Sequence, residues 1–171
     1  GMAYQALSQH KNSIKFFNEA LKLDPNNTAV LNNYANSLKA VGKLDQSKDL
    51  YEKILKIDPN YINAYNNYAN LKTSINDFNG AIFLHKKAIE LVKKNKNAHQ
   101  SSVANFLFSL AVAYQSDNKI DEVKKIIEEI FLIDPNHVGA HKLISSIYKY
   151  SLGNQETLDH IEKMKQIDKN I

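Results

Sequence analysis

The sequence of 171 residues contains no cysteine, no tryptophan and no arginine. Without cysteine it has no disulfide framework, no thiolate zinc site and no cysteine nucleophile, and a reducing compartment is permitted, so we expect a cytoplasmic protein. Glycine and proline are also scarce, with 5 and 3 residues, which argues against a loop-rich or all-β structure. The composition therefore favours an all-α protein.

Long apolar runs are absent as well. No stretch reaches the length of about 18 apolar residues that a spanning helix needs, so we expect no membrane partner. The start GMAYQALSQHKN lacks the basic region and long apolar core of a signal peptide. Gly1 before Met2 is typical of a residue left after tag cleavage, and we expect the sequence to be part of a longer protein.

All 22 positively charged side chains are lysines, and they give a net charge of +4 and a pI near 9.0. Lysine offers a point charge, whereas the arginine fork makes the bidentate contacts to guanine edges and phosphates. The lysines are also spread along the chain rather than gathered into one stripe. We therefore expect no nucleic-acid partner.

The sequence does contain an internal repeat. Asp-Pro-Asn follows an amphipathic pattern at 24–26, 58–60 and 134–136, and Pro25 lies 34 residues before Pro59. Proline stops a helix and disfavours helical geometry in the residue before it, so each Asp-Pro-Asn predicts a helix end and a turn. Pro135 follows Pro59 by 76 residues, which is two periods of 34 plus 8 and indicates an eight-residue insertion.

The first complete unit predicts helices near 28–41 and 45–57, joined by a turn at Gly42. In the next unit Asn76 takes the place of Gly42 and Lys93 the place of the proline, so its second helix should continue through Lys94. We expect the insertion to lengthen the following first helix, which would begin near Asn97. The prediction is one domain, 1–171. It begins with a partial repeat, 1–27, which starts with the tail of a first helix. Complete repeats follow at 28–61, 62–95, 104–137 and 138–171, with the insertion at 96–103.

Small residues recur at one place in each helix of the unit. They are Ala35, Ala69, Ala111 and Ser145 in the first helices and Ser47, Ala81 and Val123 in the second helices. Small side chains let two helix backbones approach closely. Larger residues should fill the space around these crossings, and in the first complete unit they are Tyr34, Leu38, Leu50, Tyr51 and Ile54.

This alternation of large and small residues, with the 34-residue period and the proline, resembles the tetratricopeptide repeat family. Family positions usually held by Trp, Gly and Tyr are Leu31, Ala35 and Leu38 here, so the resemblance rests on the whole pattern. The resemblance implies an α-solenoid of stacked antiparallel helix pairs in a right-handed superhelix. It also implies that the first helices line a concave groove that binds protein or peptide, without catalysis or a cofactor.

Asparagines on the first helices are the candidate ligand-contacting residues: Asn32, Asn33, Asn36, Asn66, Asn67 and Asn70. Residues four apart share a helix face, and an amide both donates and accepts, which suits an extended peptide backbone. Asn33 and Asn67 resemble the groove ladder of O-linked N-acetylglucosamine transferases, so we expect both to be exposed one repeat apart. Asn32, Asn36, Asn66 and Asn70 replace the basic residues of the family's two-carboxylate clamp. A compositional origin stays open, because the chain has 21 asparagines.

His137 and His141 have the four-residue spacing of a two-histidine metal site, but a third ligand is missing, and we predict no metal. We interpret both as groove-side or interhelical polar residues. His85 and His160 fall at packing positions of second helices and are interpreted as structural.

Three functions remain open. The first is a protein-interaction scaffold. The second is a substrate-docking or regulatory arm of a larger enzyme, because residues 140–170 resemble the junction before the catalytic domain of bacterial repeat-containing sulfotransferases. The third is an assembly protein that self-associates through apolar faces of its terminal helices, namely Ile14, Phe17 and Leu21 at the start and Leu158, Ile161, Met164 and Ile167 at the end.

Overall fold

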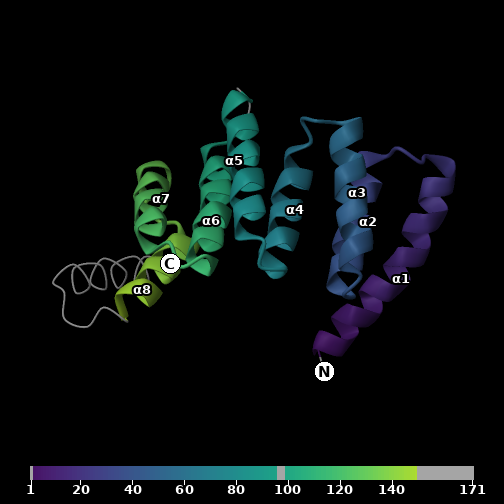
Figure 1. The fold of residues 1–171 in the computed structure, drawn as a ribbon, viewed down its shortest axis with the longest axis horizontal. Helices are drawn as coiled ribbons and strands as arrows, with labels where there is room; N and C mark the ends of the chain where they lie inside the picture. Colours follow the sequence, from purple (N-terminus) through teal and green to yellow (C-terminus); the bar gives the residue numbers. More distant parts are fainter. Residues whose placement is uncertain (1, 96–98, 150–171) are drawn as a thin grey trace. The chain divides into compact units, whose positions relative to one another are not determined.

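The computed structural model describes residues 2–95 and 99–149, and this part of the chain is built of helices without strands (Figure 1). Contacts group the chain into two compact units, unit 1 (residues 1–91) and unit 2 (residues 92–171). The helices are α1 (Met2–Leu23), α2 (Thr28–Ala40), α3 (Leu44–Ile57), α4 (Ile62–Ser74), α5 (Phe78–Lys94), α6 (Gln100–Ser116), α7 (Ile120–Ile133) and α8 (Val138–Lys149). The predicted all-α architecture of helix-turn-helix repeats is confirmed.

The turn inside each described repeat has one recurring geometry. Gly42, Asn76 and Asn118 end α2, α4 and α6 with positive φ angles of 80°, 60° and 57°. The amide of the next residue reaches back to the last turn of the helix, as in the 2.9 Å bond from Lys43 N to Leu38 O. This is a Schellman motif, which requires a left-handed residue that glycine and asparagine tolerate. The substitution of asparagine for glycine therefore preserves the turn.

The first repeat departs from the prediction. We expected the tail of a first helix before a separate second helix, but α1 is continuous from Met2 to Leu23. One period before Gly42 the chain has Ser8, which is helical. Without glycine or asparagine at that place, no left-handed turn interrupts the helix.

The turns after α1, α3 and α7 are built by Asp-Pro-Asn, as predicted. In each of these three turns the aspartate accepts a hydrogen bond from the amide two residues later, at 2.9 Å between Asn60 N and Asp58 Oδ1. The side chain of Asn27 then caps α2 by accepting from Val30 N at 3.1 Å. These contacts satisfy amides that the helix starts would leave unpaired.

Residues 100–103 of the predicted insertion belong to α6. α5 continues to Lys94, as predicted, and α6 has 17 residues where α2 and α4 have 13. The lengthened first helix is therefore confirmed, but it begins at Gln100 rather than near Asn97. His99 is the residue before the first turn and is extended, so the helix cannot include it. Residues 96–98 lie outside the described residues.

The predicted crossings form the core of each unit. Ala35, Ala69, Ala81 and Ala111 are fully buried, and so is Ser47, whose hydroxyl donates to Ala35 O at 2.8 Å. Leu38, Tyr51 and Ile54 are buried around the first crossing, whereas Tyr34 and Leu50 are only partly buried.

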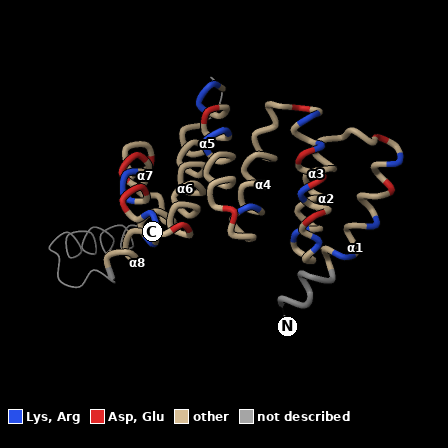
Figure 2. The backbone as a smooth tube through the Cα atoms, in the orientation of Figure 1, with Lys and Arg blue, Asp and Glu red and all other residues tan. Residues whose placement is uncertain are grey.

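Charge separates the two helices of a repeat, as Figure 2 shows. α2 and α4 carry one charged residue each, Lys39 and Lys72, and α6 carries none. α3 and α7 instead alternate lysines with acidic residues along their length. α2, α4 and α6 thus present mainly amides and apolar groups, and α3 and α7 present the strongly solvated side chains.

At the start of the chain α1 leaves Phe16 and Leu23 exposed, at 74% and 90%, while Ile14, Phe17 and Leu21 are partly buried. Self-association through this helix stays a prediction. The apolar stripe from Leu158 to Ile167 and His160 lie outside the described residues. Among the described helices, none combines the length and apolar character needed to cross a membrane.

Candidate functional site

The six candidate asparagines lie in unit 1, three on α2 and three on α4, and these two helices pack against each other. Each triplet occupies one side of its helix, because residues three and four apart are neighbours on a helix surface. Their amides differ in exposure and in the partners that they already have. Those differences decide which groups remain available to a ligand.

Asn32 and Asn67 form a bridge between the two helices. Asn32 is 6% exposed, and its Oδ1 accepts a hydrogen bond from Nδ2 of Asn67 at 3.1 Å. Asn67 is partly buried, so it differs from the exposed position that we expected. The physical reason is that α4 packs on α2 at this level, which brings an amide of each helix into contact. Asn67 keeps its own carbonyl oxygen as an acceptor.

Asn36 is oriented by a tyrosine of the next helix. The hydroxyl of Tyr51 donates to Asn36 Oδ1 at 2.6 Å. Burial raises the pKa of the Tyr51 phenol to about 12, so the phenol stays protonated and remains a donor at neutral pH. With its carbonyl oxygen occupied, Asn36 has its NH2 group left for a ligand.

Asn33 and Asn70 are exposed, and neither side chain has a hydrogen-bond partner among the described residues. Asn66 is partly buried, and its Oδ1 is buried without a partner in the described part of the chain. The ligand-contacting role of the six asparagines stays a prediction. The structure shows which hydrogen-bonding groups each amide could offer.

Lys39 was missed by the sequence analysis. It lies three residues after Asn36 and so on the same side of α2, where it is partly buried. Burial lowers the pKa of its ammonium group, and no anionic partner faces it in the described residues. The three-residue spacing from Asn36 was the signal that could have found it.

Unit 2 has different chemistry at the positions that match Asn32, Asn33 and Asn36. On α6 these positions hold Phe108, Ser109 and Val112, and Val112 is 36% exposed. The ring of Phe108 lies 5.2 Å from that of His137 and sits against Gly139, where an added Cβ would meet it at 2.9 Å. The row of amides is therefore confined to unit 1 within the described residues.

His137, just before α8, and His141, within it, already make structural contacts. His137 Nδ1 accepts from Ala140 N at 3.0 Å, which caps α8, and its Nε2 lies 3.2 Å from Asn105 Oδ1. His141 is 2% exposed, stacks on Phe131 and has Nε2 2.8 Å from Pro135 O. These contacts occupy nitrogens that a metal would need. No group of three or more potential metal ligands occurs in the described part of the chain.

His85 packs inside unit 1, as its position predicted. It is 1% exposed, and neither ring nitrogen has a partner among the described residues. Burial without a partner lowers its pKa to about 4, because the charged form cannot be solvated there.

Comparison with known proteins identifies relatives of this architecture. Residues 5–75 match the family model described as tetratricopeptide repeat. A crystal structure of MamA superposes with a TM-score of 0.77 at 20% identity, covering 95% of this chain and 91% of that chain. TPR-like repeats of a Podosopora anserina kinesin light chain give a TM-score of 0.77 at 15% identity, covering 98% and 92%. No curated protein matches by sequence.

Proposed function

We propose that this chain, in which residues 5–75 match the tetratricopeptide repeat, is a protein-interaction scaffold that binds an extended segment of a partner across α2 and α4. The proposal rests on one observation. The asparagines of these helices expose hydrogen-bonding groups that no described residue uses, on helices that carry almost no charge.

The available groups include both donors and acceptors. Asn36 offers a donor because Tyr51 holds its carbonyl oxygen, and Asn67 offers an acceptor because Asn32 holds its NH2 group. Asn33 and Asn70 offer both. An extended peptide presents N–H and C=O groups in alternation. This surface therefore fits a peptide backbone better than it fits any single side chain of the peptide.

Lys39 adds a charge preference to the backbone contacts. A partly desolvated ammonium group gains from a carboxylate beside it, since the anion replaces lost hydration. The bound segment should therefore carry an acidic residue at the position that reaches the end of α2.

Selection from a displayed library of random 12-residue peptides would test the proposal. The enriched peptides would be synthesised and titrated into ¹⁵N-labelled protein. We expect chemical-shift changes along α2 and α4, and weaker binding when backbone amides of the peptide are N-methylated, because methylation removes donors. Asn18, exposed on α1, provides the matched control, and Asn18→Ala should bind unchanged.

Two results would contradict the proposal. One is shift changes confined to α3, α7 or α8. The other is a set of N-methylated peptides that bind as tightly as the parent peptides, which would mean that side chains alone are recognised.

A further inference from the structure

Asn79 is followed by Gly80 in the first turn of α5, and this is the one Asn-Gly pair in the sequence. An asparagine side chain loses ammonia when the main-chain nitrogen of the next residue attacks its amide carbon. Glycine hinders this attack least, because it has no side chain. Asn79 is exposed, so water can reach the product of the attack. The pair is therefore a candidate site of spontaneous chemical modification.

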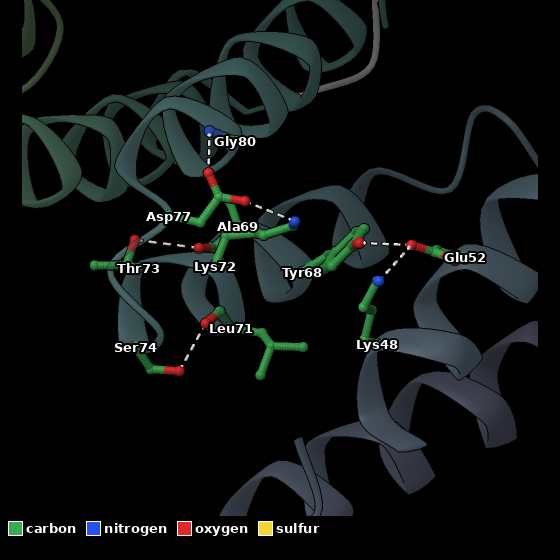
Figure 3. Close-up of polar contacts among 10 residues, drawn as sticks. All are labelled: Lys48, Glu52, Tyr68, Ala69, Leu71, Lys72, Thr73, Ser74, Asp77 and Gly80. Carbon is green, nitrogen blue, oxygen red and sulfur yellow. Dashed lines mark hydrogen bonds and ion pairs between the residues drawn. The ribbon is translucent and has the colours of Figure 1, made fainter. Parts of the chain in front are cut away.

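An aspartate holds the attacking nitrogen. Asp77 Oδ1 accepts a hydrogen bond from Gly80 N at 3.0 Å, which is the contact of an N-cap residue. Its Oδ2 accepts from Lys72 Nζ at 2.7 Å, so the carboxylate is fixed from two sides (Figure 3). The hydrogen bonds from Lys72 and then from Gly80 N lower the pKa of the Asp77 carboxyl, so it is ionised at neutral pH. The nitrogen that would attack Asn79 is thus already committed as a donor.

The helical backbone of Asn79 adds to this protection. Attack requires rotation about ψ of Asn79, which brings the nitrogen of Gly80 beside the side-chain carbon. Asn79 lies in α5, and a helical ψ of about −42° turns that nitrogen away from the side chain. The rotation would also break the hydrogen bond from Gly80 N to Asp77. The reaction therefore needs the first turn of α5 to open.

Gly80 allows the aspartate to approach this closely. A Cβ added at Gly80 would meet Oδ2 and Cγ of Asp77 at 2.7 and 2.9 Å. At the place of Asp77, α3 and α7 have Lys43 and Lys119, which make no side-chain cap bond, and neither helix has glycine three residues later. The glycine that accommodates the cap thus also creates the reactive pair.

We propose that Asn79 is a site of spontaneous deamidation and that the Asp77 cap sets its rate. In the first step a bond forms between Gly80 N and Cγ of Asn79, and the Cγ–Nδ2 bond breaks. The proton of Gly80 N leaves with the side-chain NH2 group as ammonia. Water then opens the succinimide ring at either carbonyl, which leaves aspartate or isoaspartate at position 79.

The two products have opposite consequences for α5. Aspartate is the residue that α3 and α7 carry at the matching positions, Asp45 and Asp121, whereas the first turn of α5 has no acidic residue. A negative charge there is favoured by the helix dipole. Isoaspartate adds a carbon to the main chain, so the hydrogen bonds of the first turn lose their register.

Peptide mapping would test the proposal. The 171-residue protein would be kept in neutral buffer, with and without urea, and then digested with trypsin. Residues 73–86 form one tryptic peptide, and its fragment masses separate Asn79 from Asn76. We expect conversion of Asn79 to be at least about tenfold faster in urea, because only the open chain rotates freely. In urea, Gly80→Ala should nearly stop it, because a methyl group hinders the attack.

Three variants separate the cap from overall stability. Asp77→Ala removes the cap and should speed conversion in buffer by about fivefold, the rate equivalent of one cap bond. Asp77→Asn keeps an acceptor oxygen and should retain the rate of the parent. Asn27→Ala removes the cap of α2 in the same unit, so it is the matched control and should leave the rate at Asn79 unchanged.

Equal rates for Asp77→Ala and the parent in buffer would overturn the proposal. Acceleration by Asn27→Ala as large as that by Asp77→Ala would also overturn it, because overall stability would then set the rate. A chain that keeps Asn79 intact in urea would refute the site itself. None of these measurements involves a peptide ligand, so they are independent of the proposed binding function.

Discussion

Units 1 and 2 share one frame of turns and helix crossings, and they differ in the side chains that this frame carries. Both use a left-handed asparagine in a hairpin turn, at Asn76 and Asn118, and both bury an alanine at the same crossing, at Ala69 and Ala111. Their first helices nevertheless present amides in unit 1 and largely apolar groups in unit 2. The crossings and turns therefore determine the fold. The other face of each first helix can vary in its side chains and so in what it recognises.

The cores of the two units also differ, at two equivalent positions. At one position of the second helix, unit 1 buries His85 and unit 2 buries Ile127. At one position of the first helix, unit 1 has Lys72 and unit 2 has Tyr114. Unit 1 thus has polar side chains at two places where unit 2 has a buried apolar or aromatic side chain.

The largest expected effect tests the shared frame. Ile54 and Ile130 occupy the same position of their repeats and are both fully buried. Ile54→Ala and Ile130→Ala should each lower the free energy of unfolding by about 2–5 kcal/mol, because each leaves a cavity in the core. Urea denaturation followed by circular dichroism would measure both. A loss below about 1 kcal/mol in either unit would show that the frames are not equivalent.

A smaller effect, on the pH dependence of the unfolding free energy, should distinguish the two cores. The pKa of His85 is lowered from 6.5 to about 4, so the unfolded chain binds a proton more readily than the folded chain between these values. The stability contribution is present above pH 6.5 and is lost as the pH falls towards 4, by about 3 kcal/mol at most.

His85→Leu should remove this part of the pH dependence, measured as the difference in unfolding free energy between pH 7 and pH 4.5. Ile127→Leu, at the matching position of unit 2, is the control and should keep the dependence of the parent. An identical pH profile for His85→Leu and the parent would exclude His85 as its source.

The smallest expected effect concerns the bridge between α2 and α4, which has no counterpart at Phe108. Asn32→Ala and Asn67→Ala, combined in a double-mutant cycle, should show a coupling energy of about 0.5–1.5 kcal/mol, as for one partly buried hydrogen bond. Chemical denaturation would supply the four stabilities. A coupling energy indistinguishable from zero would mean that the bridge does not stabilise the packing.

Much of the frame could be predicted from the sequence because its signals are local. The Asp-Pro-Asn stops, the Gly42 turn and the small residues at the crossings each act within a few residues of their position. The missing turn at Ser8 was a local signal too, and reading it would have predicted the continuous α1. The start of α6 was predicted less accurately because α6 has no strong N-cap residue. Local sequence specifies poorly where such a helix begins.

The candidate site was less predictable because it depends on contacts between helices. Equal spacing made Asn33 and Asn67 look alike, but packing of α4 on α2 turns Asn67 towards Asn32. Tyr51 orients Asn36 from another helix, 15 residues away in sequence. Lys72 pairs with Asp77 across the turn after α4, and residue type alone does not specify that contact.

The most direct test of the central claim, that the amides of unit 1 bind a peptide backbone, is calorimetry with one selected peptide. The triple variant Asn33→Ala, Asn36→Ala and Asn70→Ala would be compared with the parent and with Asn18→Ala. We predict that the triple variant loses affinity by about tenfold or more, from several lost hydrogen bonds, while Asn18→Ala matches the parent. Parent-like affinity in a folded triple variant would contradict the claim.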